Sequence, residues 1–135
     1  MLFEKFNIEH KLHHVSFIDD RLVEEQMPEF APAKTVPTVR TPEGVIVGDS
    51  LAIAEELASR YPDAGILPKD PAARAVARFL MSEMHSGFGD LRNDCPMNLR
   101  VAYSETSPSD EVKKDLARLE KIWAYARKTV GSEGP

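Results

Sequence analysis

Cysteine is nearly missing from this chain, since Cys95 is the only one among its 135 residues. A single thiol excludes an internal disulfide framework, a CxxC redox pair and a cysteine-rich zinc site. Long apolar runs are also missing, because no stretch approaches the roughly 18 residues that a bilayer crossing needs. The N-terminal letters "MLFEKFNIEHKL" carry charges where a signal peptide has its apolar centre. We therefore expect a cytoplasmic protein that does not associate with a membrane.

A surplus of positive charge is absent as well. The net charge is −5 and the lysines and arginines are dispersed, whereas a nucleic-acid-binding protein presents a basic face. We therefore expect no nucleic acid among the partners. With 42% hydrophobic residues, the chain can form the core of one ordinary domain or of two very small ones.

The histidines do not predict a metal site. His10, His13 and His14 lie close in sequence, but on a strand His13 and His14 face opposite sides and no cysteine lies near them. His85 follows Glu83 without the spacing of a zinc protease. We therefore expect no bound metal, and Cys95 lies in a connector where we assign it no catalytic role.

The first half of the chain predicts a mixed α/β arrangement. Residues 1–9 have the apolar spacing of a helix end, and residues 12–17 alternate in period two as a strand does. Residues 19–30 are polar enough for one short helix that ends before Pro28. Residues 38–40 and 45–47 flank the turn "TPEG" and predict an antiparallel hairpin.

The second half of the chain predicts helices. An amphipathic helix begins at Ser50 and ends before Pro62, and residues 62–71 are rich in proline, which favours an extended connector with Leu67 tucked under a second domain. Asp70 and Pro71 predict the start of a helix that runs to about Arg92.

A capping box at "SPSD" predicts the start of a last helix. Its expected core stripe consists of Val112, Leu116, Leu119, Trp123 and Ala126. The order along the chain is thus mixed α/β first and all-helical second.

Four motifs in this order resemble the glutathione transferase family. They are "KTVPTV" before the hairpin, "VGDSLAIAEELASRYP" after it, the linker "ILPKDPAARA", and a helix containing "EMHSGF". The resemblance implies a thioredoxin-like glutathione-binding domain at residues 1–62, followed at residues 63–135 by the linker and the first helices of a helical C-terminal domain. The implied fold class is α/β plus all-α, and both domains are expected to be incomplete.

The expected incompleteness concerns the ends of the sequence. In the family, a first strand and a turn precede the opening helix and carry the serine, tyrosine or cysteine that stabilises the glutathione thiolate. That segment is absent from this sequence, so the catalytic residue stays unassigned and the chain is expected to be a fragment, a mispredicted gene product or a degenerate copy. Whether it is an enzyme is left open.

Asp49 and Ser50 are the first candidate binding residues. One side-chain oxygen suffices to cap a helix, so the other is available for a ligand. A helix N-terminus attracts a carboxylate, Ser50 adds a hydroxyl donor, and Asp49 attracts an ammonium group. The γ-glutamyl end of glutathione carries both charges on one carbon. The alternative is a plain N-cap with a neighbour that faces solvent.

Val36, Pro37 and Lys34 are the second group. The resemblance implies a cis bond between Val36 and Pro37, which turns the Val36 backbone outward to pair with the cysteinyl part of glutathione. Lys34 could neutralise the glycyl carboxylate, or it could be a solvated loop residue. The alternative for Pro37 is a trans proline at the start of a strand.

The second-substrate pocket implied by the resemblance includes Met84, His85 and Phe88, for which ordinary core packing is the alternative. The resulting hypothesis is a glutathione transferase-like homodimer that conjugates or exchanges the glutathione thiol with a small electrophile, with glutathione as the substrate. The alternatives are a non-catalytic relative that binds a protein partner, and an inactive truncated product.

Overall fold

The computed structural model describes residues 2–18, 20–98 and 100–131. The chain divides into two compact units, Met1–Leu67 and Pro68–Pro135. The division falls inside the proline-containing connector, where a short 3-10 helix, η2 (Pro62–Ala64), is followed by irregular chain. Leu67, which we expected under the second domain, is grouped with the first unit, where its neighbour Ile66 packs on the core. Within the described ranges, no helix is both long enough and apolar enough for a bilayer crossing.

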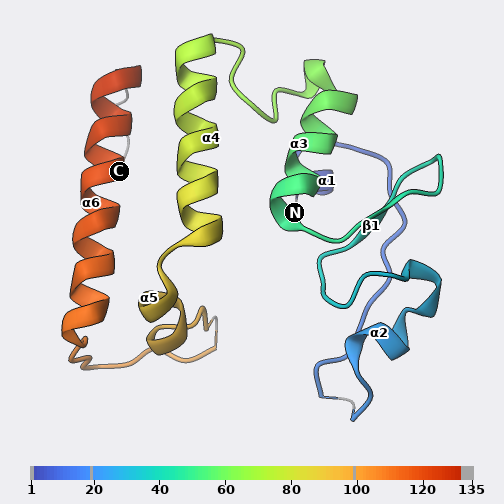
Figure 1. Cartoon of the computed structure of the whole chain (residues 1–135), viewed down its shortest axis with the longest axis horizontal. Helices are drawn as coiled ribbons and strands as arrows, with labels where there is room; N and C mark the ends of the chain where they lie inside the picture. The colour runs from blue at the N-terminus through green and yellow to red at the C-terminus, as the bar shows by residue number, and fades with distance from the viewer. Residues whose placement is uncertain (1, 19, 99, 132–135) are drawn as a thin grey trace. The chain divides into compact units, whose positions relative to one another are not determined.

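The first unit is built from short helices around a two-stranded hairpin (Figure 1). Besides η2, its elements in chain order are α1 (Leu2–Lys5), α2 (Val23–Gln26), η1 (Pro28–Phe30), β1 (Val39–Arg40), β2 (Ile46–Val47) and α3 (Ser50–Arg60). The short helix before Pro28, the hairpin and the helix that begins at Ser50 are all where the sequence predicts them.

The hairpin is antiparallel, with Val39 opposite Val47 and Arg40 opposite Ile46. Its turn contains Gly44 at φ +88°, a backbone conformation that strains residues with a side chain. β2 leads directly into α3, which packs Ile53 and Leu57 against Ile8 to form the core of the unit. The hairpin and the core are thus joined through one short connection.

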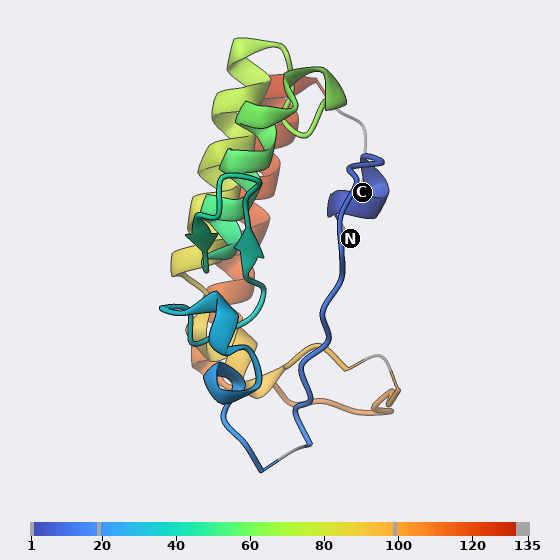
Figure 2. The same ribbon diagram turned by 90° about the vertical axis from the view of Figure 1, so that its right-hand side faces the viewer.

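Residues 12–17 do not form the predicted strand, and this expectation is wrong. Figure 2 shows the chain running from α1 to the loop before α2 as one long stretch. At Ser16 the side-chain amide of Gln26 donates to the backbone oxygen at 3.0 Å and accepts from the backbone N–H at 2.9 Å. The alternating pattern is compatible with an extended chain, but a strand also needs a neighbouring backbone, which the pattern does not specify.

The second unit consists of α4 (Pro71–Ser86), α5 (Gly89–Asp94) and α6 (Asp110–Val130). Figure 1 shows α4 and α6 side by side, and α6 packs on both other helices. The predicted caps are present, since Asp70 accepts from the N–H of Ala73 and Ser109 accepts from that of Val112. A bidentate ion pair between Arg118 and Glu83, with its closest N–O distance at 2.6 Å, joins α6 to α4.

The helix predicted from residue 71 to about residue 92 is broken at Gly87, which corrects the sequence-based expectation. A Cβ atom at Gly87 would lie 2.9 Å from the backbone oxygen of Glu83, a distance at which something has to move. Phe88 follows with φ +60°, and its side chain is buried against Leu119 and Ile122. Burial of the Phe88 ring stabilises the second unit and so compensates for the break in the helix. In a continuous helix the Phe88 side chain would point in another direction.

The predicted stripe on the last helix is correct at Val112, Leu119 and Ala126 and wrong at two other positions. Leu116 is 40% exposed and Trp123 is 47% exposed, whereas Ile122 is buried. On a helix, neighbouring positions differ by about 100°, so the orientation of the packing face decides which of two adjacent apolar residues becomes buried.

Candidate functional site

The N-terminus of α3 is capped by Asp49. Its Oδ1 atom accepts hydrogen bonds from the backbone N–H groups of Leu51 and Ala52, each at 2.9 Å. Ser50 is the first helical residue and is exposed, and its hydroxyl makes no hydrogen bond to another described residue. Asp49 therefore acts as the cap, and Ser50 is the member of the pair whose side chain remains available.

A turn at residues 35–38 lies beside this helix start. The Thr38 hydroxyl donates to the backbone oxygen of Thr35 at 2.6 Å, and the Val36–Pro37 bond within the turn is cis, as expected. A Cβ atom built on Gly48 would lie 3.6 Å from the Thr38 oxygen. Because Gly48 directly precedes Asp49, the Thr38 end of the turn lies near the capped N-terminus of α3. This is consistent with the predicted position of Val36 and Pro37 beside that helix start, which stays a prediction.

The exposures of the predicted residues fit a site at the surface of the first unit. Val36 is half-buried, whereas Pro37 and Lys34 are exposed. Lys34 has no ion pair with any residue in the described part of the chain, so its ammonium group is available to an anion. The five predicted glutathione-binding residues therefore all belong to one unit, although their roles stay predictions.

The predicted second-substrate residues belong to the other unit. Met84 and His85 are exposed in the last turn of α4, and Phe88 is 5% exposed within the core that it forms with α6. Their part in a substrate pocket stays a prediction.

Electrostatic interactions in the first unit centre on Arg60 at the C-terminal end of α3. Its guanidinium donates to both carboxylate oxygens of Glu43, at 2.9 and 2.7 Å, and to Glu56 at 2.5 Å. The hydrogen bonds from Arg60 are the main reason that the pKa of Glu43 falls from 4.5 to about 2, and those to Glu43 and Glu56 raise the pKa of Arg60. This network ties the hairpin turn to α3. The pair Glu56–Arg60 was readable from its spacing, but the partner in the turn was not.

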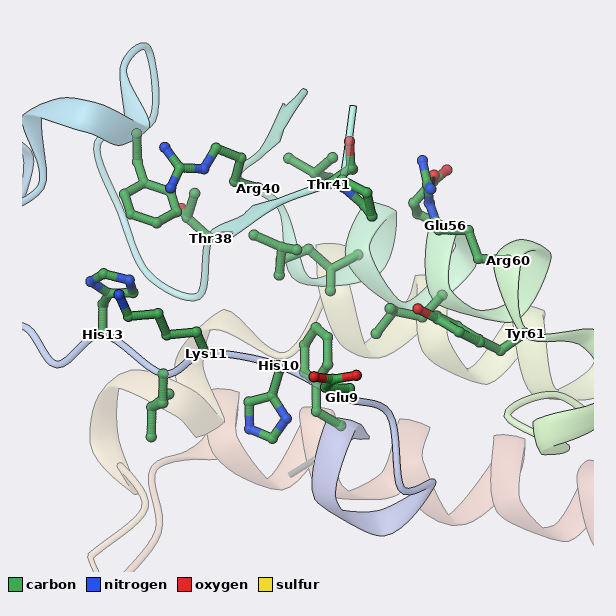
Figure 3. A pocket seen from close by; sticks show the side chains of 18 residues that line it. Glu9, His10, Lys11, His13, Thr38, Arg40, Thr41, Glu56, Arg60 and Tyr61 are labelled. Carbon is green, nitrogen blue, oxygen red and sulfur yellow. Dashed lines mark hydrogen bonds and ion pairs between the residues drawn. The ribbon is translucent and has the colours of Figure 1, made fainter. Parts of the chain in front are cut away.

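Sequence reasoning missed a groove in the first unit (Figure 3). It encloses about 370 Å³ between the chain at residues 9–13 and strand β1. Its lining includes the apolar side chains of Phe3, Ile53 and Leu57. At one end the Arg40 guanidinium lies 5.2 Å from the centre of the Phe30 ring. No pattern in the sequence indicated this groove, because its two sides come from segments whose apposition only the fold defines.

Two further histidines, His13 and His10, take part in ring and backbone contacts. The His13 ring meets Phe30 edge-on at 5.8 Å, and His10 Nδ1 lies 2.9 Å from the backbone oxygen of Ile8. Residues 2–18, 20–98 and 100–131 contain no group of three or more His, Cys, Asp or Glu side chains that could hold a metal ion.

The first unit contains a hairpin that leads into a capped helix, beside a turn with a cis proline, and a helical unit follows it in sequence. This arrangement is consistent with a thioredoxin-like domain plus helices. Comparison with known families agrees, because residues 1–60 match the family described as "Glutathione S-transferase, N-terminal domain". The family-model match over residues 1–60 and the relatives described next support the glutathione transferase family for this chain.

Among characterised relatives, the chain is similar to maleylacetoacetate isomerase of Dictyostelium discoideum, with 30% identity over 87% of this chain and 52% of the relative. It is also similar to a probable maleylacetoacetate isomerase of Caenorhabditis elegans, with 34% identity over 64% of this chain and 40% of the relative. The enzyme of Rattus norvegicus is 32% identical over the same shares. The chain thus spans about half the length of these relatives or less. No solved structure matches it.

Proposed function

We propose that the first unit binds glutathione along the turn at residues 35–38 and the N-terminus of α3. The observation that carries this proposal is the adjacency of the turn to a capped helix start at which the Ser50 hydroxyl has no partner among the described residues. The match of residues 1–60 to a glutathione S-transferase domain supports it independently.

The tripeptide has three parts that suit three neighbouring features. Its γ-glutamyl carboxylate faces the N–H and the hydroxyl of Ser50 at the positive end of α3, while its ammonium group faces Asp49. Its cysteinyl backbone pairs with the backbone of Val36, as a short added strand would. Lys34 is the counter-ion for the glycyl carboxylate.

The proposed reaction is attack of the glutathione thiolate on an electrophilic carbon of a small substrate. Such chemistry needs the thiol to lose its proton near neutral pH, because the thiolate is the nucleophile. Conjugation leaves the sulfur bound to the substrate, whereas isomerisation releases glutathione again after a bond in the adduct has rotated. Since the relatives are named maleylacetoacetate isomerases, maleylacetoacetate is the first substrate to test. Met84, His85 and Phe88 remain the proposed residues of the second-substrate pocket, and a homodimer remains the proposed assembly.

The decisive experiment titrates glutathione into the chain by calorimetry and compares Ser50→Ala with Ser59→Ala. Both serines are exposed on α3, but only Ser50 lies at its N-terminus. Loss of one hydrogen bond to a charged group weakens binding roughly 10- to 150-fold. We expect this loss for Ser50→Ala and none for Ser59→Ala. Equal affinities for the two variants, or no glutathione binding by the unaltered chain, would contradict the proposal.

Turnover is measured separately with maleylacetoacetate and with a generic electrophile. Consumption of either substrate that depends on glutathione supports the enzymatic proposal. Glutathione binding without turnover of any electrophile would instead favour the non-catalytic alternative, in which the same scaffold serves a binding role.

A further inference from the structure

The loop at residues 33–38 carries three of the groups that are proposed to bind glutathione, those of Lys34, Val36 and Pro37. The start of this loop is anchored, because the backbone N–H of Ala33 donates to the backbone oxygen of Phe30 at 3.0 Å. Its end leads directly into strand β1. The interactions between these two anchors therefore decide how the loop presents its binding groups.

One side-chain hydrogen bond closes the loop. The Thr38 hydroxyl donates to the backbone oxygen of Thr35 at 2.6 Å and so spans Val36 and Pro37. No other hydrogen bond between described residues involves residues 34–37. A threonine hydroxyl that bonds to a nearby backbone oxygen can hold a turn that neither a helix nor a ladder holds. Removal of this hydroxyl should therefore free the backbone of Val36.

Gly48 lies against both ends of the loop. A Cβ atom built on Gly48 would lie 3.3 Å from the Cβ of Ala33 and 3.6 Å from the Thr38 oxygen. The φ angle of Gly48 is not positive, so the backbone there does not require glycine. Space does require it, because a neighbour at 3.3 Å would have to move by a few tenths of an ångström. The missing side chain thus lets the loop lie against the residue that precedes the cap Asp49.

We propose that Thr38 and Gly48 are positioning residues of the glutathione site. Thr38 fixes the shape of the loop, and Gly48 fixes how closely the loop approaches the start of α3. Together they set the Val36 backbone relative to Ser50, so the cysteinyl part of the tripeptide meets a preorganised partner. The inference rests on the proposed function, because it explains how that site is held in shape.

The first test measures glutathione affinity by calorimetry on the whole chain with Thr38→Val, Thr38→Ser and Thr129→Val. Thr129 also donates its hydroxyl to a backbone oxygen, that of Tyr125 at 2.9 Å, but in the second unit. We expect Thr38→Val to weaken binding roughly 2- to 10-fold, as the loss of one neutral hydrogen bond does. Thr38→Ser keeps the hydroxyl and should bind as the unaltered chain does, and so should Thr129→Val.

A second ligand separates positioning from a general loss of stability. Glutathione methylated at its cysteinyl nitrogen cannot donate to the backbone oxygen of Val36. Methylation should weaken binding to the unaltered chain and to Thr38→Ser by roughly 2- to 10-fold. Its effect on Thr38→Val should be smaller, because the pairing that it removes is already impaired there. A variant that is only less stable would respond to methylation as the unaltered chain does.

Gly48 is tested with a compensating pair of substitutions. Gly48→Ala should weaken glutathione binding roughly 2- to 10-fold, because the added methyl group displaces the loop. Adding Ala33→Gly removes the nearest atom and leaves the new methyl group at ordinary contact distances of 3.6 and 3.9 Å. The double variant should therefore bind glutathione more tightly than Gly48→Ala alone.

The outcomes for the two residues are separate from the outcome for the proposed function. Equal affinities of Thr38→Val and the unaltered chain, or equal losses in Thr38→Val and Thr38→Ser, would overturn the role of Thr38. No recovery in the double variant would overturn the role of Gly48. In each case the unaltered chain would still bind glutathione and lose affinity in Ser50→Ala, so the proposed function would stand. Absence of binding to the unaltered chain would contradict the proposed function, and this inference with it.

Discussion

Asp49 is the residue at which the structural and the proposed binding roles can be separated. Its Oδ1 atom satisfies two backbone N–H groups of α3, and its negative charge faces the positive end of the helix dipole. An asparagine also caps helices well but carries no charge, whereas an alanine does neither. The variant Asp49→Asn therefore removes only the charge, whereas Asp49→Ala removes both the charge and the cap.

The expected stability changes follow from the cap geometry. Asp49→Ala removes the charge and also leaves two N–H groups without a protein partner, so the loss should be about 1 to 2 kcal/mol, in the upper part of the usual range of roughly 0.5 to 2 kcal/mol. Asp49→Asn keeps an accepting oxygen and loses only the interaction with the dipole, about 0.3 to 1 kcal/mol. Urea denaturation of the three proteins measures both values.

The expected binding changes follow a different order. If Asp49 holds the ammonium group of glutathione, Asp49→Asn and Asp49→Ala should weaken binding by similar factors, roughly 10- to 150-fold for one charge-assisted hydrogen bond. Calorimetry on both variants measures this. Affinity that is unchanged in Asp49→Asn would refute the ammonium contact and leave Asp49 as a cap alone. A loss of stability as large in Asp49→Asn as in Asp49→Ala would refute the capping argument.

Three further predictions concern the framework. Gly87→Ala should destabilise the second unit by roughly 1 to 3 kcal/mol in thermal or urea unfolding, because the added methyl group meets a backbone oxygen, while Gly89→Ala, which points into open space, should not. Ile122→Ala should cost about 2 to 5 kcal/mol, since this side chain is 3% exposed, and a loss below about 1 kcal/mol would show that it is not in the core. The folded-state pKa of Glu43 lies below its ordinary value, so its ion pair with Arg60 should stabilise the first unit above about pH 4.5 and this contribution should vanish as the pH falls towards 2. Acid titration of Glu43→Gln should lack that step, and a titration identical to that of the unaltered chain would contradict the assignment.

Local chemistry in the sequence determined where the three longest helices, α3, α4 and α6, begin. Asp49, Asp70 and Ser109 each supply an oxygen that reaches N–H groups two or three residues further on. Such caps operate within one turn of chain, so they work wherever the helix is finally placed. The same holds for the hairpin, because its turn at Gly44 joins two short strands that are adjacent in sequence.

The candidate glutathione residues were selected because four motifs occur in one order along the chain, and their roles stay a proposal. The sequence alone could not say how Asp49 and Ser50 divide their roles, since either oxygen can cap a helix. Their positions in the fold decided it, because Asp49 has extended backbone angles and precedes the first helical residue. An N-cap side chain reaches the helix only from that conformation.

Only the tertiary structure decided which segments meet. The interruption at Gly87 and the burial of Phe88 depend on the neighbouring helix α6, and the choice of Ile122 over Trp123 depends on how that helix is rotated. The alternating residues 12–17 remain an unpaired extended chain because strand formation requires a second backbone at hydrogen-bonding distance. A local pattern fixes which face of a segment is apolar, whereas burial and pairing are properties of two surfaces that the fold brings together.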